Sequence, residues 1–576
     1  MHRNALIDFF AKITNRRRAP DVSEITPSAT SNVWNAGVEV PGQMRMNTIA
    51  PVNHLPPEIL SVIFDISSIQ PLVHELPRKE EWATAYHSAR VLQTQIMAVC
   101  RLWRDTVLST SNLWSDIAAL TTEGCPTSIQ LSRAQGIALC LYNNAGHRAK
   151  EILPVLASHT RRIRVLWICD ACGSWIPTED IRDVFLSFPE LAHCVEEVTV
   201  HANSPPSWPL AKMPSSPPRT LFSGFAPQLR VLRLTLPCLP FIPEDRFPNL
   251  TELYLDNDCH VTHSALLSLL ERAPMLEQVY LATPIPWSSA GPPLTRRIVP
   301  MPKLRRITLD VQADPFPLLR ALALPPSCLV KLTLSGASDL PGCLAALEGQ
   351  LYCSQLTRLS LNVDWHPERE SGDVVLITTV CNASATQGLA LSVQCDGRGG
   401  SSSIPVLRET LTTAFRTSPI YADVRELTVF VNQRIVDAPF LDSLPRLTTL
   451  NHIFCRPPPT YYEVLEGNYI SRLTQTSPDG RVTCPNLTTL YFIDCPFDAL
   501  ADARAILEFR KQNGRPLTRL GIDCSVALKH EVRALGKRVK ELDVNFCDVP
   551  GYEGALDVAP EGGWRGHSAR ARRHWP

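Results

Sequence analysis

The sequence predicts an α/β protein in which a small helical module precedes a curved solenoid, with a parallel sheet inside and helices outside. Three observations support this prediction. Apolar residues recur at helical spacing between Leu55 and Val107, and a second apolar pattern then repeats along the chain as far as residue 549. Proline accounts for 50 of the 576 residues, which excludes long helices and long central strands, so the chain must consist of short elements.

The chain divides into four predicted segments. Residues 1–50 lack sustained periodicity and are expected to be mostly disordered, with at most a short helix at 4–14. Residues 51–120 form the helical module, and residues 121–549 form the solenoid. Residues 550–576 are predicted to be a disordered basic tail, because Arg recurs there without an apolar pattern.

The helical module begins with a clear helix start. Pro56 and Pro57 suit a first helical turn, which needs no backbone donor, and Glu58 is favourable in that turn. The apolar residues that follow share one helix face: Ile59, Leu60, Ile63 and Phe64. Residues 65–95 contain Pro71 and Pro77 and are predicted to be a looped insertion.

A second helix is predicted from about Ser88 to Val107, partly overlapping the insertion. Its apolar residues are Ile96, Val99, Cys100, Leu102 and Trp103. The module ends at Asn112-Leu113-Trp114, shortly before residue 120.

Three motifs in this order resemble an F-box, in the form abundant in mushroom-type fungi. They are Leu-Pro-Pro-Glu-Ile-Leu at 55–60, Val-Cys-Arg-Leu-Trp-Arg at 99–104 and Asn-Leu-Trp at 112–114. An F-box docks on a Skp-type adaptor, and through it on the cullin of an SCF ubiquitin ligase. The resemblance implies these adaptor-binding residues: Leu55, Pro56, Pro57, Ile59, Leu60, Ile63, Phe64, Val99, Cys100, Trp103, Leu113 and Trp114. The alternative is that these residues form only the core of an unspecified helical bundle.

The remaining sequence repeats the pattern Leu-x-x-Leu-x-Leu, as in Leu250-Thr-Glu-Leu253-Tyr-Leu255 and Leu356-Thr-Arg-Leu359-Ser-Leu361. Taking its fourth position as an anchor gives 15 sites from Leu139 to Leu542, with a mean period of (542 − 139)/14, about 29 residues. This pattern resembles leucine-rich repeats, in degenerate form. The resemblance implies a strand and then a helix in each repeat. Helices are predicted at 264–272, 406–417 and 498–511, and proline-rich loops at 204–218, 284–300, 396–405 and 457–459.

The concave face of the predicted sheet is the candidate surface for a target protein. Side chains alternate along a strand, so the third and fifth positions of each repeat point away from the core. The predicted substrate-binding residues there are Tyr254, Tyr280, Arg306, Lys331 and Arg358. They are expected to be exposed on successive strands, over about 20 Å for Tyr254 to Arg358. The alternative is that each of them is an ordinary solvated sheet residue.

The sequence indicates no bond chemistry of its own. Cys169-Asp-Ala-Cys172 has no second cysteine pair nearby, so packing is preferred over a metal or redox role, and no cofactor or metal is predicted. Asn249-Leu-Thr251 and Asn486-Leu-Thr488 match glycosylation sequons, but Leu250 and Leu487 should be buried. With 56 basic and 56 acidic residues, no nucleic acid and no membrane is expected as a partner.

The predicted function is that of a non-enzymatic substrate receptor of a ubiquitin ligase, located in the cytoplasm or the nucleus. The helical module would dock on the Skp-type adaptor, and the repeats would bind an unknown protein substrate. The alternative is a repeat scaffold or sensor protein that binds partners without the adaptor.

Overall fold

A computed structural model describes residues 55–68, 95–110, 116–119, 137–143, 159–170, 193–201, 225–235, 246–255, 263–282, 298–310, 315–334, 340–348, 350, 355–365, 374–382, 387–395, 403–430, 438–453, 469–476, 480–495, 499–524 and 528–546. The chain divides into two compact units, one formed by Met1–Asp180 with Arg573–Pro576 and the other by Ile181–Arg572. The predicted segments 1–50 and 550–576 lie outside the described residues, as do the predicted loops 204–218 and 457–459.

The described residues of the first unit form the helices α3 and α5 and three strands that pair in parallel. The helices are α3 (Pro57–Ser68) and α5 (Arg101–Ser109). Strand β2 pairs in parallel with both β1 and β3. The bounds of these elements are β1 (Asp116–Ala119), β2 (Ile137–Asn143), η3 (Thr160–Arg162) and β3 (Ile163–Asp170).

The second predicted helix is interrupted just before α5. Residues 95–97 are helical, but Ala98 and Val99 form a turn. Cys100 then has an extended backbone, with φ −160° and ψ 172°, before α5 starts at Arg101. The prediction of one continuous helix is therefore wrong, because an extended residue cannot continue the i→i+4 hydrogen bonds of a helix.

The second unit is built on one large sheet. Following the pairings, its strands lie in the order β4, β5, β6, β7, β9, β11, β14, β13, β12, β15, β16, β17, β18 and β19. Their bounds are β4 (Glu197–His201), β5 (Val231–Thr235), β6 (Glu252–Leu255), β7 (Gln278–Leu281), β9 (Arg306–Asp310), β11 (Leu329–Leu334), β12 (Arg358–Trp365), β13 (Val374–Cys381), β14 (Gly388–Cys395), β15 (Glu426–Phe430), β16 (Thr449–Ile453), β17 (Thr489–Cys495), β18 (Arg519–Cys524) and β19 (Glu541–Phe546). Every pairing is parallel except the two made by β13, so the predicted α/β class with a mostly parallel sheet is confirmed.

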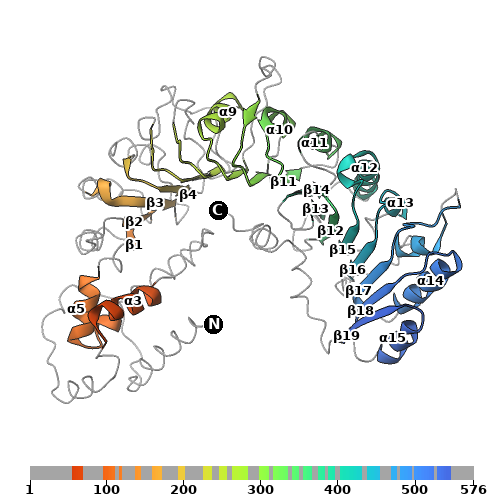
Figure 1. The fold of residues 1–576 in the computed structure, drawn as a ribbon. Coiled ribbons are helices and arrows are strands. Elements are labelled where there is room, and N and C mark those ends of the chain that lie inside the picture. Colours follow the sequence, from red (N-terminus) through yellow and green to blue (C-terminus); the bar gives the residue numbers. More distant parts are fainter. Residues whose placement is uncertain are drawn as a thin grey trace. The chain divides into compact units, whose positions relative to one another are not determined.

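The described α-helices of the second unit lie on the same side of this sheet (Figure 1). They are α9 (His263–Arg272), α10 (Phe316–Ala321), α11 (Leu340–Leu347), α12 (Ser403–Thr417), α13 (Ala438–Asp442), α14 (Ala499–Gln512) and α15 (Lys529–Gly536). Two short 3₁₀ helices are η10 (Pro419–Tyr421) and η11 (Tyr469–Thr474). The helices predicted at 264–272, 406–417 and 498–511 correspond to α9, α12 and α14 and are confirmed, with bounds that differ by one to three residues.

The anchor residues of the repeat explain why these strands form. All 15 of them lie on a strand. Their side chains are buried, apart from Leu139, whose side chain is not described, and Leu542, which is half-buried on β19. Burial of a leucine side chain contributes about 1.5–3 kcal/mol, so the regular anchors supply much of the driving force for stacking one strand and helix on the next.

Strand β13 departs from the repeat pattern. Its sequence, Val-Val-Leu-Ile-Thr-Thr-Val-Cys, is a continuous β-forming run without the Leu-x-x-Leu spacing. It runs antiparallel between β12 and β14, so β14 lies beside β11, and β12 lies beside β15. At Gly388 a Cβ atom would stand 2.7 Å from the carbonyl oxygen of Val380, so only glycine fits this close approach of the two strands.

Two predicted loops contain regular structure at their ends. The segment 284–300 ends in β8 (Val299–Pro300), which pairs in parallel with β10 (Leu322–Ala323). The segment 396–405 overlaps the start of α12 at Ser403. Both loops are therefore shorter than predicted, because Pro405 is accommodated near the beginning of α12 and Pro300 in the very short strand β8.

Helix α14 is joined to the turn before β17 through a buried arginine. Arg510 is fully buried, and its guanidinium donates hydrogen bonds to the carbonyl oxygens of Thr483, Cys484 and Leu487 at 3.1, 3.1 and 2.9 Å. Cys484 has a φ of 49°, which turns the backbone so that these carbonyls converge on one point. Burial lowers the pKa of Arg510, and the carbonyl dipoles take the place of the water that burial removes.

Burial of His452 is expected to make the stability of the second unit pH-dependent. His452 on β16 is 2% exposed, its ring lies edge-on to Phe492 with centroids 6.1 Å apart, and burial lowers its pKa to about 3. Below pH 6.5 the unfolded chain binds a proton that the folded chain does not. We therefore expect His452 to reduce the free energy of unfolding by up to about 1.4 kcal/mol for each pH unit below 6.5.

Urea titrations between pH 7 and pH 5 test this expectation. His452→Leu should flatten the pH slope of the unfolding midpoint relative to the unsubstituted chain. His530→Leu replaces an exposed histidine and serves as the control, which should keep the slope. An unchanged slope in His452→Leu would show that His452 is not the group responsible.

Candidate functional site

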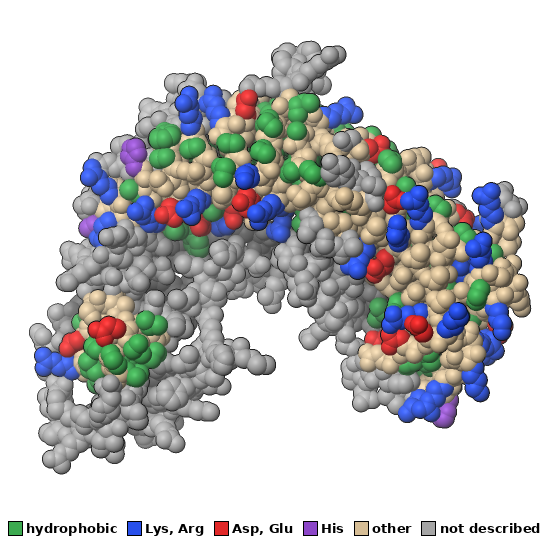
Figure 2. Space-filling view, in the orientation of Figure 1, with side chains coloured by type: hydrophobic (Ala, Val, Ile, Leu, Met, Phe, Trp, Pro, Cys, Tyr) green, Lys and Arg blue, Asp and Glu red, His purple; other side chains and the backbone are tan. Residues whose placement is uncertain are grey.

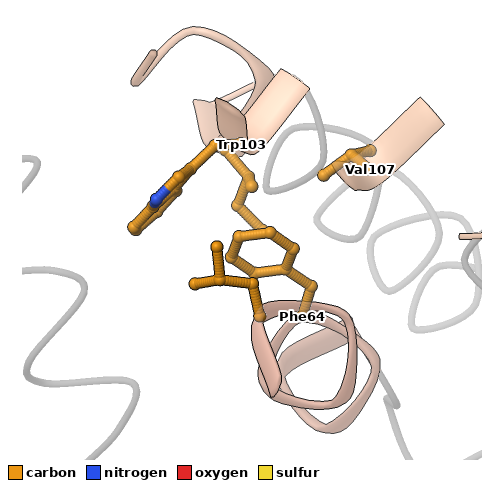
Figure 3. Packing of buried hydrophobic residues seen from close by; sticks show 5 residues of the cluster. Phe64, Trp103 and Val107 are labelled. Carbon is orange, nitrogen blue, oxygen red and sulfur yellow. The ribbon is translucent and has the colours of Figure 1, made fainter. Parts of the chain in front are cut away.

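Helices α3 and α5 share a small apolar core. Leu60 and Phe64 from α3 meet Trp103 and Val107 from α5, together with Ile96. The rings of Phe64 and Trp103 are 5.0 Å apart and tilted by 57°, with Val107 beside them (Figure 3). An aromatic pair in this arrangement contributes beyond the area it buries, so the Phe64–Trp103 contact is the centre of the module.

The start of helix α3 follows from its sequence. The amides of Ile59 and Leu60 both donate to the carbonyl oxygen of Pro56 at 3.0 Å, which closes the first turn. Pro57 occupies the first helical position, and Glu58 lies in the first turn, as predicted.

Helix α3 also carries large apolar side chains that are not packed into the core and remain exposed to solvent. Ile59 and Val62 lie on the side away from Leu60, and they remain 48% and 52% exposed. Pro56 and Pro57 are exposed beside them. On α5, Leu102 and Leu108 are also exposed large apolar residues. The exposed strip of α3 formed by Pro56, Pro57, Ile59 and Val62 is called the α3 apolar strip below.

The predicted adaptor-binding residues separate into three groups. Pro56, Pro57 and Ile59 are exposed and available to a partner. The partly buried members, which pack against the core, are Leu55, Ile63, Val99 and Cys100. Leu60, Phe64 and Trp103 are buried in the packing of α3 against α5. Their side chains therefore do not contact a partner directly, contrary to the prediction, and they instead hold the two helices together. Leu113 and Trp114 lie outside the described residues.

In the second unit, the sheet face opposite the helices carries a row of paired charges. Arg233 on β5 bonds Glu197 on β4 at 3.2 Å and Glu252 on β6 at 3.0 Å. Further along, Arg358 on β12 bonds Glu426 on β15 at 3.0 Å. These acidic partners were not among the predicted site residues, although opposite charges at equivalent strand positions are visible in the sequence.

The predicted aromatic pair on this face is present, with Tyr254 buried and Tyr280 half-buried. Tyr254 and Tyr280 stack with ring centroids 4.2 Å apart and an interplanar angle of 2°. Tyr254 is only 3% exposed, so the prediction that it is exposed is wrong. Adjacent parallel strands place the two rings directly side by side, and each ring shields the other from water.

The three predicted basic residues do not form a surface of uncompensated positive charge. Arg306 is half-buried, and burial lowers its pKa against the opposing effect of Glu252. Lys331 is half-buried. Burial raises the pKa of the nearby Asp310 carboxyl, and the positive charge of Lys331 offsets part of that rise. Arg358 is exposed but paired with Glu426. This face is therefore close to charge balance.

The predicted residues also lie farther apart than expected. Arg306 and Lys331 are on the neighbouring strands β9 and β11. Arg358 on β12 is separated from β11 by β13 and β14. Six strand steps therefore lie between Tyr254 and Arg358, about 29 Å in place of about 20 Å. The prediction of successive strands fails because β13 turns the chain back on itself.

The two sequons belong to the framework of the repeat. Leu250 and Leu487 are buried, as predicted. The side chains of Asn249 and Asn486 donate to the carbonyl oxygens of Pro227 and Pro445 at 2.7 and 2.9 Å, so each links its repeat to the previous turn. The sequence did not reveal this contact, because the two partners are 22 and 41 residues apart.

Within the described part of the chain, no group of three or more His, Cys, Asp or Glu side chains could hold a metal ion. Cys172 of the Cys-x-x-Cys motif lies outside that part. No described helix has the length and apolar character needed to cross a bilayer.

The chain matches no known family model. No curated protein matches its sequence at a significant level.

Proposed function

We propose that this protein is a substrate-receptor subunit of an SCF-type ubiquitin ligase. The two-helix module acts as an F-box that docks on a Skp-type adaptor, and through it on a cullin. The second unit acts as a degenerate leucine-rich-repeat solenoid that binds a target protein. The chain performs no bond chemistry, and it promotes ubiquitination in the cytoplasm or nucleus by raising the effective concentration of the target near the conjugating enzyme.

The α3 apolar strip is the observation on which this proposal rests. Two large aliphatic side chains, Ile59 and Val62, stay about half exposed on a short helix whose other side is packed against Trp103. Exposed apolar residues that cluster on one helix favour a protein partner over water. Three of its four residues, Pro56, Pro57 and Ile59, belong to the Leu-Pro-Pro-Glu-Ile-Leu motif that resembles an F-box, and this resemblance favours a Skp-type adaptor as the partner.

The recurring strands of the second unit support the recognition role. Their regular anchors and one-sided helices agree with a repeat array, and such arrays present an extended sheet face to protein partners. The balanced charges on that face favour a partner with both acidic and basic groups over a purely acidic one.

Co-purification of the full chain with a Skp-type adaptor tests the proposal. The unsubstituted chain should retain the adaptor. The double change Ile59→Asp with Val62→Asp should abolish retention, because two carboxylates would be desolvated in an apolar interface. Both positions are exposed, so the folding of the module should be little affected.

Leu108→Asp provides the matched control. Leu108 is also an exposed apolar residue, 41% accessible, but it lies on α5, and the substitution should leave adaptor retention intact. If the unsubstituted chain does not retain the adaptor, the proposal fails and the scaffold alternative replaces it. Equal retention by the double variant would show that the α3 apolar strip is not the docking surface.

A further inference from the structure

Residues 511–540 of the second unit carry an excess of positive charge, although the whole chain has no net charge. Residues 511–540 contain eight Lys and Arg but only two Asp and Glu, whereas the full chain has 56 of each kind. The two acids are Asp523 and Glu531. A charge imbalance of this size within 30 residues produces a local positive potential even on a neutral protein.

The helix α15 places several of these cations on one side. Lys529, Arg533 and Lys537 follow at i, i+4 and i+8, and all three are exposed. Val532 and Leu535 of the same helix are buried. The outward side of α15 therefore presents positive charge along about 12 Å, at 1.5 Å for each residue.

Neighbouring segments extend the positive surface. Lys511 lies at the end of α14, Arg515 lies in the turn that follows, and Lys540 directly precedes β19. Helices α14 and α15 pack against each other, so these cations belong to the same end of the unit. Figure 2 shows Lys and Arg side chains spread over this end, where Figure 1 places α14 and α15. The basic stripe is defined as Lys511, Arg515, Lys529, Arg533, Lys537 and Lys540.

The cations of the basic stripe differ from nearby cations that form ion pairs with acidic residues of the same unit. Arg519 bonds Asp543, and Arg538 bonds Glu508. In the described residues, no member of the stripe has an ion pair or a side-chain hydrogen bond to an acidic group. Stability does not account for six unpaired like charges, since like charges on one helix side are mildly destabilising.

We propose that the basic stripe binds an acidic segment of a protein partner. An extended peptide rises about 3.3 Å for each residue, so about five residues span the roughly 12 Å covered by the α15 cations. The flexible lysine stems can follow such a segment, and each charge pair adds attraction that salt weakens. This binding is independent of adaptor docking.

The composition of the stripe favours a peptide over the other polyanions. Single-stranded nucleic acid is bound by combining cations with aromatic side chains on which bases stack, and the stripe contains no aromatic residue. Insertion into an anionic membrane needs large apolar side chains beside the cations. The exposed positions of α15 between its cations are His530 and Ala534.

Fluorescence anisotropy with the full chain and a labelled oligoglutamate peptide tests this inference. The peptide should bind at low salt, more weakly at moderate salt, and a Gly/Ser peptide of equal length should not bind. The triple variant Lys529→Glu, Arg533→Glu and Lys537→Glu should bind the peptide at least about tenfold more weakly. All three positions are exposed, so the thermal unfolding of the variant should match that of the unsubstituted chain.

A matched triple variant controls for the change of net charge. Arg272→Glu, Lys303→Glu and Arg320→Glu alter the charge of the same unit equally, at exposed positions outside the stripe. This variant should bind the peptide as the unsubstituted chain does. Equal losses in both triple variants, or none in the first, would overturn the inference. Tighter binding of a short single-stranded oligonucleotide than of the peptide would reassign the stripe to nucleic acid.

Discussion

Arg510→Ala is expected to lower the free energy of unfolding of the second unit by about 3–5 kcal/mol, because three buried carbonyl oxygens lose their donors at once. The guanidinium reaches the oxygens of Thr483, Cys484 and Leu487, and the side chain has no exposed surface. Water cannot replace it without opening the α14 packing. Arg510→Lys should recover only part of the loss, since an ammonium cannot reproduce the planar fork.

Arg504→Ala is the matched control for this prediction. Arg504 lies on the same helix but is exposed, so its loss should change the stability by less than about 0.5 kcal/mol. Urea unfolding of the three variants measures the difference. Similar midpoints for Arg510→Ala and Arg504→Ala would mean that the carbonyl contacts add nothing to stability.

Trp103→Ala is expected to remove about 3–5 kcal/mol from the stability of the two-helix module. The indole is 2% exposed and packs on Phe64 at 5.0 Å, and the small core holds few other large side chains. Hydrogen exchange should show lost protection in α3 and α5. Protection in β5, β6 and β7 should persist, because those strands belong to the other unit.

Leu102→Ala is the matched control, because it shows whether the loss of protection comes from the buried Trp103 packing or from any alanine substitution in α5. Leu102 is the neighbouring residue but is 36% exposed, so protection should fall by much less than in Trp103→Ala. If the proposed function is right, Trp103→Ala also loses the adaptor, by disordering the helix that carries Ile59 and Val62. Retained protection in Trp103→Ala would refute the assignment of the indole to the core.

The helices and most strands of the second unit could be predicted because their signals are local. Leu253 and Leu255, for example, alternate along β6, and Leu266, Leu269 and Leu270 recur at helical spacing in α9. Such periodicities report which face of an element is buried, without reference to any other part of the chain. Strand β13 was missed because its continuous β-branched run has no such alternation and depends on β12 and β14 for its place.

The candidate site was only partly predictable. Its residue types were visible in the sequence, and Pro56, Pro57 and Ile59 are exposed as a docking surface requires. Which apolar residues of a helix face a neighbour, however, depends on where that neighbour lies. The packing of α5 on α3 buries Leu60, Phe64 and Trp103, and it leaves Ile59 and Val62 outside.

The sequence by itself therefore determined the α/β fold class, the positions of the strands that carry an anchor residue, and the anchors themselves, since each follows from a short-range pattern. Only the tertiary structure decided the order of the strands around β13, the stacking that covers Tyr254, and the acids that neutralise Arg233 and Arg358. The charge pairs and the tyrosine stack join residues that lie 19 to 68 positions apart, and a one-dimensional pattern contains no information about which distant segments meet when the chain packs.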